Sequence, residues 1–237
     1  MKAIIGGTGI DKDSRFLEKM EMIVTKYGDA YYSIIDGILY LPRHKPGHTL
    51  PPHMINYKAN VQALMDLDVD EVISIYAVGS ITRRLSPGRF GLVRDFIDLA
   101  FSRANTFYDG STREVRHTPF VEPFDRKLGA RFARNAINSG SSLALDCVYI
   151  TTNGPRLETP AEIMAYRNMG ADVVGMTLGT EAALLKEAGI RNAAVAYSIN
   201  WAAGLDAEGI SFLEDESIER LARNIINIAE KTLTAAG

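Results

Sequence analysis

The chain has 237 residues, of which 46% are hydrophobic and 23% are charged, and it contains a single cysteine. A chain of this size can bury a full hydrophobic core without disulfides or structural metals, and its composition excludes fibrous, disordered and disulfide-rich secreted classes. The net charge of −3, with no run of about five or more like charges, argues against nucleic-acid or membrane partners, and one cysteine favours a reducing, cytoplasmic setting.

Apolar runs and amphipathic segments alternate along the chain. The first run ends at the glycine-rich residues 6–9, and Asp36-Gly37 separates two β-rich segments as a hairpin turn. Predicted strands are residues 2–5, 31–35, 38–41, 72–78, 90–93, 143–151, 172–176 and 193–198. Predicted helices are residues 56–67, 128–137, 160–169, 180–188 and 215–235. We therefore predict one α/β domain over residues 1–237, with a mixed central β-sheet flanked by helices and ligands at strand carboxyl ends.

Two groups near the first strands could bind an anion. Glycines at 6–9 allow backbone N–H groups a close approach, and Arg43 with His44 offers charged donors after the strand at 38–41. The glycine run matches neither the dinucleotide fingerprint nor a P-loop. A tight structural turn and a solvated charged pair are the ordinary alternatives, and the local sequence leaves both open.

Further polar residues follow later strands. Glu158 can accept N–H groups from a planar ligand, and Asn200 offers both a donor and an acceptor. Met176-Thr177 ends another strand in the same way. Glu158 could instead serve the dipole of the helix that Thr159 caps, and Asn200 could be a turn residue. Their recurrence at successive strand ends favours one shared crevice.

Several chemistries lack their residues. His48 and His53 lie near His44, but no carboxylate or cysteine stands at metal-ligand spacing, so we predict no metal site. The chain has no G-x-S-x-G, H-E-x-x-H or C-x-x-C. Common hydrolase and redox mechanisms are therefore disfavoured.

Longer segments resemble a known family. They are IIGGTGI, LPRHKPGHTLPPHMINYKAN, AVGS, FYDG, HTPFVEPF, GPRLETPAEI, GADVVGMT, EAALLKEAGI and INWAAG, in order along almost the whole chain. Together they are similar to the trimeric purine nucleoside phosphorylases and methylthioadenosine phosphorylase. The resemblance implies a pentosyltransferase of purine salvage that uses orthophosphate as co-substrate, without an organic cofactor or a metal.

The resemblance also implies site residues. Its phosphate site corresponds to Thr8, Arg43, His44, the backbone at Ala77, and Thr177. Its base site corresponds to Val78, Gly79, Leu157, Glu158 and Asn200, with Met176 under the ribose. Asn200, Glu158 and His44 are the expected catalytic residues. The segment from His117 to Phe120 is expected to reach a neighbour's pocket, so the resemblance implies a homotrimer with shared active sites.

The choice of base depends on Asn200. Family members that prefer 6-aminopurines resemble one another in carrying Asp there, often with a second Asp two positions on, where this chain has Ala202. Glu158 can accept N1–H of a 6-oxopurine, whereas adenine N1 is itself an acceptor. We therefore expect hypoxanthine or guanine as the base. Leu157 replaces an aromatic residue common in the family, which leaves base stacking open.

The 5′ end of the sugar is a separate question. Family members that take ordinary nucleosides resemble one another in placing a histidine after the base-binding Asn, but no histidine follows Asn200 here. The apolar residues 209–213 instead suit a methylthio group, with Phe212 as the expected 5′ contact. Phe212 and Leu213 could equally fasten the last helix to the core.

These observations favour S-methyl-5′-thioinosine as the substrate. The alternatives are an inosine and guanosine phosphorylase, a methylthioadenosine phosphorylase, and a nucleoside-binding sensor without catalysis. A sensor would not need the phosphate residues that the resemblance assigns.

Overall fold

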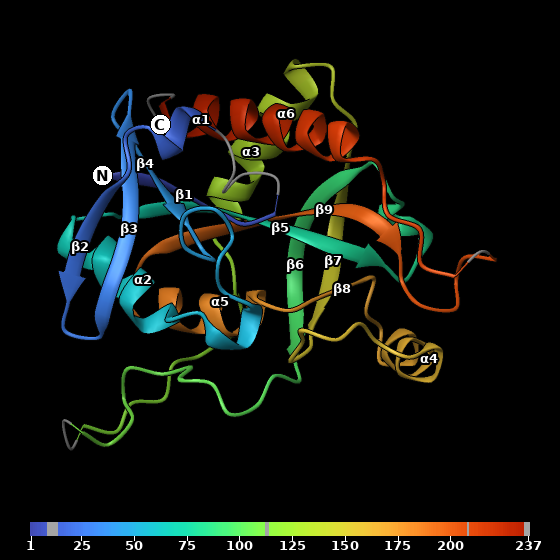
Figure 1. The fold of residues 1–237 in the computed structure, drawn as a ribbon, viewed down its shortest axis with the longest axis horizontal. Coiled ribbons are helices and arrows are strands. Elements are labelled where there is room, and N and C mark those ends of the chain that lie inside the picture. The colour runs from blue at the N-terminus through green and yellow to red at the C-terminus, as the bar shows by residue number, and fades with distance from the viewer. Residues whose placement is uncertain (9–13, 112–113, 208, 235–237) are drawn as a thin grey trace.

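Helices cover both faces of a mixed sheet (Figure 1). Helices α3 (Arg126–Asn138) and α6 (Asp215–Thr234) lie on one face, and α2 (Tyr57–Asp66) and α5 (Leu178–Glu187) lie on the other. The computed structural model describes residues 1–8, 14–111, 114–207 and 209–234. The shorter helices are α1 (Ser14–Leu17) and α4 (Pro160–Asn168), with single 3-10 turns at η1 (Pro52–Met54) and η2 (Arg83–Leu85).

The strands form one nine-stranded sheet within the described residues. They are β1 (Lys2–Gly6), β2 (Glu21–Thr25), β3 (Gly28–Ile35), β4 (Ile38–Pro42), β5 (Glu71–Ser80), β6 (Phe90–Asp98), β7 (Leu143–Thr151), β8 (Val173–Gly175) and β9 (Arg191–Trp201). Strands β4, β1, β5 and β9 are parallel, so their carboxyl ends meet at one edge. The predicted fold class, a mixed sheet flanked by helices, is confirmed.

Part of this sheet closes on itself. Strand β5 pairs with both β8 and β9, and the chain of pairings continues from β9 through β6 and β7 back to β8. The hairpin of β2 and β3 extends the sheet beyond β4 at the other end. Closure removes sheet edges there and pairs β8 with the end of β5. Gly79 of β5 and Val174 of β8, which pair there, both line the cavity described below.

Local signals placed most elements correctly. Asp36 and Gly37 both have positive φ, as a two-residue hairpin turn between right-twisted strands requires. Thr159 and Glu162 form a reciprocal capping box at the start of α4. Helix α5 begins at Leu178, two residues earlier than predicted, so Thr177 is its N-cap. The predicted Gly9 and Ala235 lie outside the described residues.

Strand β2 and helix α1 were not predicted. Strand β2 is an edge strand in which the apolar Met22 and Val24 are exposed. Its hydrophobic residues therefore do not alternate with polar ones in the pattern that predicts a half-buried strand. Helix α1 has four residues and buries only Phe16 against Tyr40, with ring centroids 4.1 Å apart. Both elements are therefore fixed by tertiary packing rather than by local pattern.

Cys147, on β7, is fully buried, and burial raises the pKa of its thiol to about 12. Since the thiolate is the reactive species, we expect no reaction with a thiol-modifying disulfide reagent in the native protein at neutral pH. Reaction should become rapid after unfolding in guanidinium chloride. A native-state rate equal to that of a free cysteine would contradict the burial of this side chain.

Candidate active site

A cavity of about 290 Å³ opens where the predicted site residues meet. It is lined by the turn after β1, the loop after β4, the end of β5, the residues around β8, and the end of β9 with the segment that follows it. Its predicted lining residues are Thr8, Arg43, His44, Ala77, Val78, Gly79, Leu157, Glu158, Met176, Thr177, Asn200 and Phe212. His117 is the one predicted site residue that does not line it.

The turn after β1 forms one wall. Gly7 allows it to approach the loop after β4, because a Cβ on Gly7 would lie 3.1 Å from both Arg43 Nη1 and His44 Cδ2. The hydroxyl of Tyr197, on β9, donates a hydrogen bond to the carbonyl oxygen of Thr8. The glycine turn therefore brings the backbone close to the side chains of Arg43 and His44.

Arg43 is fixed from several directions. Its Nε and Nη2 donate to the Glu181 carboxylate at 2.6 and 2.9 Å, and its Nη1 donates to the carbonyl of Ile75 at 3.1 Å. The guanidinium lies over the ring of Tyr76, 4.4 Å from its centroid. Burial by itself would lower the pKa of Arg43, but the charge and hydrogen bonds of Glu181 raise it above its ordinary value. With the side chain 2% exposed, the solvated-pair alternative is wrong.

His44 lies in a tight loop. Its Nδ1 is 2.8 Å from the carbonyl oxygen of Leu50, and its ring stacks on that of His48 with centroids 4.1 Å apart. Lys45 and His48 both adopt positive φ, which folds the loop back so that both imidazoles reach the cavity. His44 is 6% exposed and is therefore a buried cavity group as well.

Thr177 stands at the N-terminus of α5. Its side chain makes no capping hydrogen bond, and it lines the cavity. The first N–H groups of a helix point outward with a partial positive charge, which suits an anion. Together with Thr8, Arg43 and His44, this helix start gives one end of the cavity several donors for an oxyanion.

Glu158 and Asn200 give the cavity its other polar groups. Glu158 accepts a hydrogen bond from Thr152 Oγ1 at 2.7 Å, whereas the capping role in α4 belongs to Glu162. Asn200 Nδ2 donates to the carbonyl of Trp201 at 2.8 Å. An amide nitrogen carries two hydrogens, so this bond leaves a second hydrogen and Oδ1 for a ligand.

A β-bulge presents Asn200 to the cavity. The β5–β9 register shifts between Val78 and Gly79, so Val78 pairs with Ser198 and Gly79 pairs with Asn200. Both Ile199 and Asn200 consequently line the cavity, although successive residues of a regular strand face opposite ways. Gly79 lies close to the amide, because a Cβ there would be in contact with Val174 Cγ1 at 3.3 Å and with Asn200 Nδ2 at 3.4 Å.

Arg103 does not line the cavity but binds the backbone of a residue that does. It donates to the carbonyls of Met176 at 2.6 Å and Asn153 at 2.7 Å. Met176 itself lines the cavity. Sequence reasoning did not select Arg103, and its isolated position in a loop gave no signal.

The sequence left two roles open for Phe212 and Leu213, a contact to the ligand and attachment of the last helix to the core, and each residue has one of them. Leu213 packs against the core cluster that contains α6 residues, while Phe212 is 54% exposed and lines the cavity. Residues Phe212 and Asn200 form an antiparallel bridge, and Leu213 N–H donates to the Ile199 carbonyl. The segment is thus fastened to β9 and still presents an apolar ring to the site.

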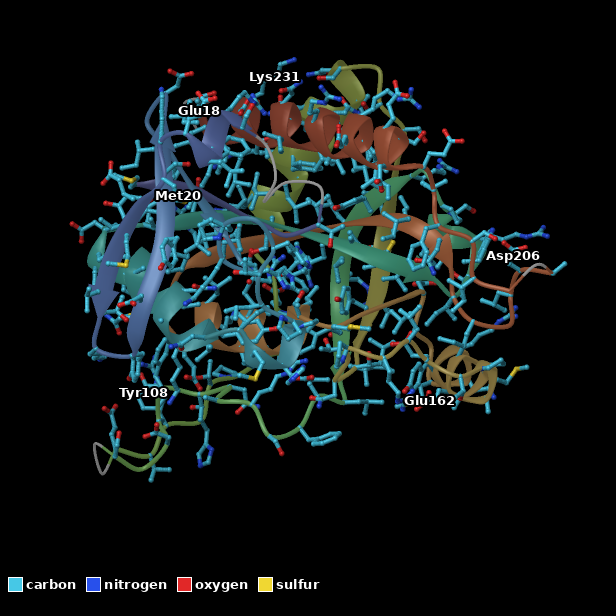
Figure 2. All side chains as sticks on the ribbon, viewed as in Figure 1. Glu18, Met20, Tyr108, Glu162, Asp206 and Lys231 are labelled. Carbon is cyan, nitrogen blue, oxygen red and sulfur yellow. The ribbon has the colours of Figure 1, made fainter. Side chains whose placement is uncertain are left out.

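His117 lies on the exposed segment between β6 and α3, away from the cavity of its own chain. This segment runs along the lower edge of the molecule, where Tyr108 is labelled in Figure 2. Phe120 packs edge-on against Phe96 of the same chain, with centroids 5.9 Å apart. The expected contact of His117 with a neighbouring subunit stays a prediction.

Several cavity residues were not selected from the sequence. They are Pro52, Pro155, Val174, Gly175, Ile199, Ala203 and Ile210, together with His48, which the sequence suggested only as a metal ligand. For His48 a signal existed, since Lys45-Pro46-Gly47 predicts a turn that returns the chain toward His44. The apolar residues gave no such signal.

A larger cavity of about 690 Å³ lies between α3, β6 and β7. None of the predicted site residues lines it, and its polar lining comes from charged side chains such as Arg94, Arg134 and Asp146. In the part of the chain that the structure describes, no cluster of three or more His, Cys, Asp or Glu could hold a metal ion. The same residues contain no helix long and apolar enough to cross a membrane.

Comparison with known proteins places the chain in a family. The family model of the Phosphorylase superfamily matches residues 3–234. A probable S-methyl-5′-thioinosine phosphorylase from Methanothermobacter thermautotrophicus is 36% identical, over 98% of this chain and 83% of the relative. A 6-oxopurine nucleoside phosphorylase from Pyrococcus furiosus is also 36% identical, over 98% and 91%. Methylthioadenosine phosphorylase from Schistosoma mansoni, solved with tubercidin, has a TM-score of 0.86 and 29% identity, covering 100% of this chain and 92% of that one.

The chain therefore belongs to the phosphorylase superfamily. Within it, this protein is an enzyme of the nucleoside phosphorylase class, a pentosyltransferase, as its relatives and structural neighbours are. The family resemblance drawn from the sequence motifs is confirmed.

Proposed function

We propose that this enzyme cleaves a 6-oxopurine nucleoside by phosphorolysis, with S-methyl-5′-thioinosine as the favoured substrate. An orthophosphate oxygen forms a bond to C1′ as the bond from C1′ to the purine N9 breaks. The products are hypoxanthine and 5-methylthioribose 1-phosphate. One observation carries this proposal: a single cavity is lined both by the anion donors Thr8, Arg43, His44 and Thr177 and by Glu158 and Asn200.

Strand β5 connects these two groups of residues. Arg43 is hydrogen-bonded to the carbonyl of Ile75, and Asn200 pairs with Gly79 on the same strand. Ala77 and Val78, which lie between these two positions of β5, also line the cavity, so the anion donors and the base residues are arranged along one strand. Met176 also lines the cavity and would contact the sugar.

The reaction needs a held nucleophile and donors for the leaving base. Thr8, Arg43, His44 and the N-terminus of α5 at Thr177 would hold orthophosphate close to C1′, with the backbone at Ala77 beside them. The negative charge of the phosphate that they hold would stabilise the ribosyl group as it becomes cationic. The chemistry requires no organic cofactor or metal, because the phosphate is itself a substrate.

The base end favours a 6-oxopurine. Glu158 would accept the N1–H of hypoxanthine. The hydroxyl of Thr152 donates to Glu158 Oε1 at 2.7 Å, which holds the carboxylate in place. Asn200 would donate its second amide hydrogen to O6 or N7 as negative charge develops on the leaving purine. Val78, Gly79 and Leu157 would enclose the ring.

The 5′ group is the finer part of the proposal. The segment after β9 brings the apolar side chains of Ile210 and Phe212 to the cavity. Burying a thiomethyl group on such a surface is favourable by about 1–2 kcal/mol, while an unpaired hydroxyl costs about 1–3 kcal/mol. His48 also reaches the cavity and could serve a 5′-hydroxyl, which keeps inosine as the second candidate.

We also propose that the enzyme works as a homotrimer in the cytoplasm. The support for shared sites is that His117 is exposed and does not line the cavity of its own chain. A reducing compartment agrees with a single buried, unpaired cysteine.

A substrate panel tests this function. Release of free base should be measured for S-methyl-5′-thioinosine, inosine, guanosine and methylthioadenosine, with and without orthophosphate. We expect phosphate-dependent release and the highest kcat/KM for S-methyl-5′-thioinosine. A preference for inosine would overturn the 5′ assignment alone, and a preference for methylthioadenosine would overturn the base assignment. Binding without turnover would favour the sensor alternative.

A further inference from the structure

Glu181 is a buried carboxylate that the proposed reaction does not use. It lies on α5, is 1% exposed and is not among the residues that line the cavity. It accepts hydrogen bonds from Arg43 Nε and Nη2 at 2.6 and 2.9 Å and from the hydroxyl of Tyr76 at 2.8 Å. A buried charge that touches a phosphate-site residue but not the site itself needs an explanation.

We propose that Glu181 is a positioning residue for orthophosphate, which holds the Arg43 guanidinium with Nη1 beside the Gly7–Thr8 turn. The proposal rests on the phosphate role of Arg43 proposed above. It adds a residue to the machinery of the reaction that lies behind the site and acts only through another side chain.

The hydrogen bonds of Arg43 show which groups are left to bind the anion. Of the five N–H groups of a guanidinium, one on each nitrogen is used, toward Glu181 and the Ile75 carbonyl. One N–H therefore remains on each terminal nitrogen. Nη1 faces the glycine turn, because a Cβ on Gly7 would lie only 3.1 Å from it. The remaining Nη1 donor therefore lies beside the turn where a phosphate would bind.

Three neighbours hold this orientation. The carboxylate of Glu181 fixes one edge of the guanidinium, the Ile75 carbonyl fixes another, and the ring of Tyr76 lies against its face. Tyr76 is itself tied to Glu181. A free arginine side chain would lose several rotamers on binding phosphate, whereas this one has already lost them.

The ion pair also changes what attracts the phosphate. Because Glu181 balances the charge of Arg43, recognition depends on the direction of the remaining N–H groups more than on net charge. Removing the carboxylate charge would add positive charge but release the orientation. The two effects have opposite signs on phosphate affinity, so kinetics can tell them apart.

The chain offers a matched control. Glu71, at the opposite end of β5, has a side chain that is 2% exposed and accepts a bidentate pair of hydrogen bonds from Arg131 at 3.1 and 3.0 Å. Arg131 is 24% exposed and Glu71 also pairs with Lys2 and Arg191, so Glu71 is a buried carboxylate in an ion-pair network that does not line the cavity.

The experiment compares Glu181→Gln, Tyr76→Phe and Glu71→Gln with the unaltered enzyme. Phosphate is varied at saturating nucleoside, nucleoside is varied at saturating phosphate, and Tm is recorded. For Glu181→Gln we expect the KM for phosphate to rise about ten- to a hundredfold, with the nucleoside KM changed less than about twofold. Tyr76→Phe should raise the phosphate KM by a smaller factor. Glu71→Gln should lower Tm and leave both KM values unchanged.

The outcomes separate the possibilities. An unchanged or lower phosphate KM in Glu181→Gln, or an equal rise of both KM values, would overturn the positioning role. If Glu181→Gln does not fold, Tyr76→Phe decides by the same comparison. Turnover of the unaltered enzyme that ignores phosphate would instead overturn the proposed function, and it is measured before any variant.

Discussion

Arg43→Ala is expected to remove most of the phosphate-dependent activity. The substitution deletes a charge-assisted contact worth about 1.5–3 kcal/mol, which corresponds to roughly a 10- to 150-fold loss in kcat/KM for phosphate. It also leaves Glu181 buried without its partner, so a negative charge would face the incoming anion. The loss should therefore exceed the value of the contact alone and should appear mainly as weaker phosphate binding.

The matched control for this variant is Arg131→Ala. Arg131 also pairs with a buried glutamate, Glu71, but neither residue lines the cavity. Steady-state kinetics and Tm should be measured for both variants. Both are expected to be destabilised, and only Arg43→Ala should lose affinity for phosphate. Similar phosphate kinetics in the two variants would show that Arg43 has a structural role only.

Asn200→Asp is expected to reverse the preference between bases. A carboxylate at this position repels O6 of hypoxanthine but accepts a hydrogen bond from a 6-amino group. Where polar groups become unpaired, such a change can alter a specificity ratio by about four powers of ten. The ratio of kcat/KM for S-methyl-5′-thioinosine to that for methylthioadenosine measures the effect.

Stability must be separated from specificity in that variant. The Asn200 amide donates to the Trp201 carbonyl, and a carboxylate there would place two acceptors together. Asn192→Asp is a suitable control, because Asn192 is also a buried amide on β9, near the end away from the cavity, and accepts from Ser74 Oγ at 3.0 Å. It should lower Tm without altering the ratio. An unchanged ratio in Asn200→Asp would remove Asn200 from base selection.

The site residues could be predicted from the sequence because they lie at the ends of recognisable strands. Arg43-His44, Glu158 and Asn200 stood at the ends of strands that periodicity could detect, and parallel strands bring such ends together. The hairpin turn at Asp36-Gly37 and the capping box of α4 were also local, since each depends on residues within three positions of one another.

Other features depend on residues far apart in the chain. The pair of Arg43 and Glu181 joins residues separated by 138 positions, and no local pattern relates them. The stacking of His44 on His48 depends on a loop held in left-handed backbone conformations. The bulge in β9 changes which way Asn200 faces, although the residues around it read as an ordinary strand.

The sequence by itself determined the order of most strands and helices, the α/β class and the polar residues at strand ends, because hydrophobic periodicity, turns and caps act over a few residues. Only the tertiary structure decided that β5 to β9 close into a ring, that the bulge presents Asn200, and that Glu181 orients Arg43. These features arise when distant segments pack together, where burial and the need to pair every buried polar group outweigh local preference.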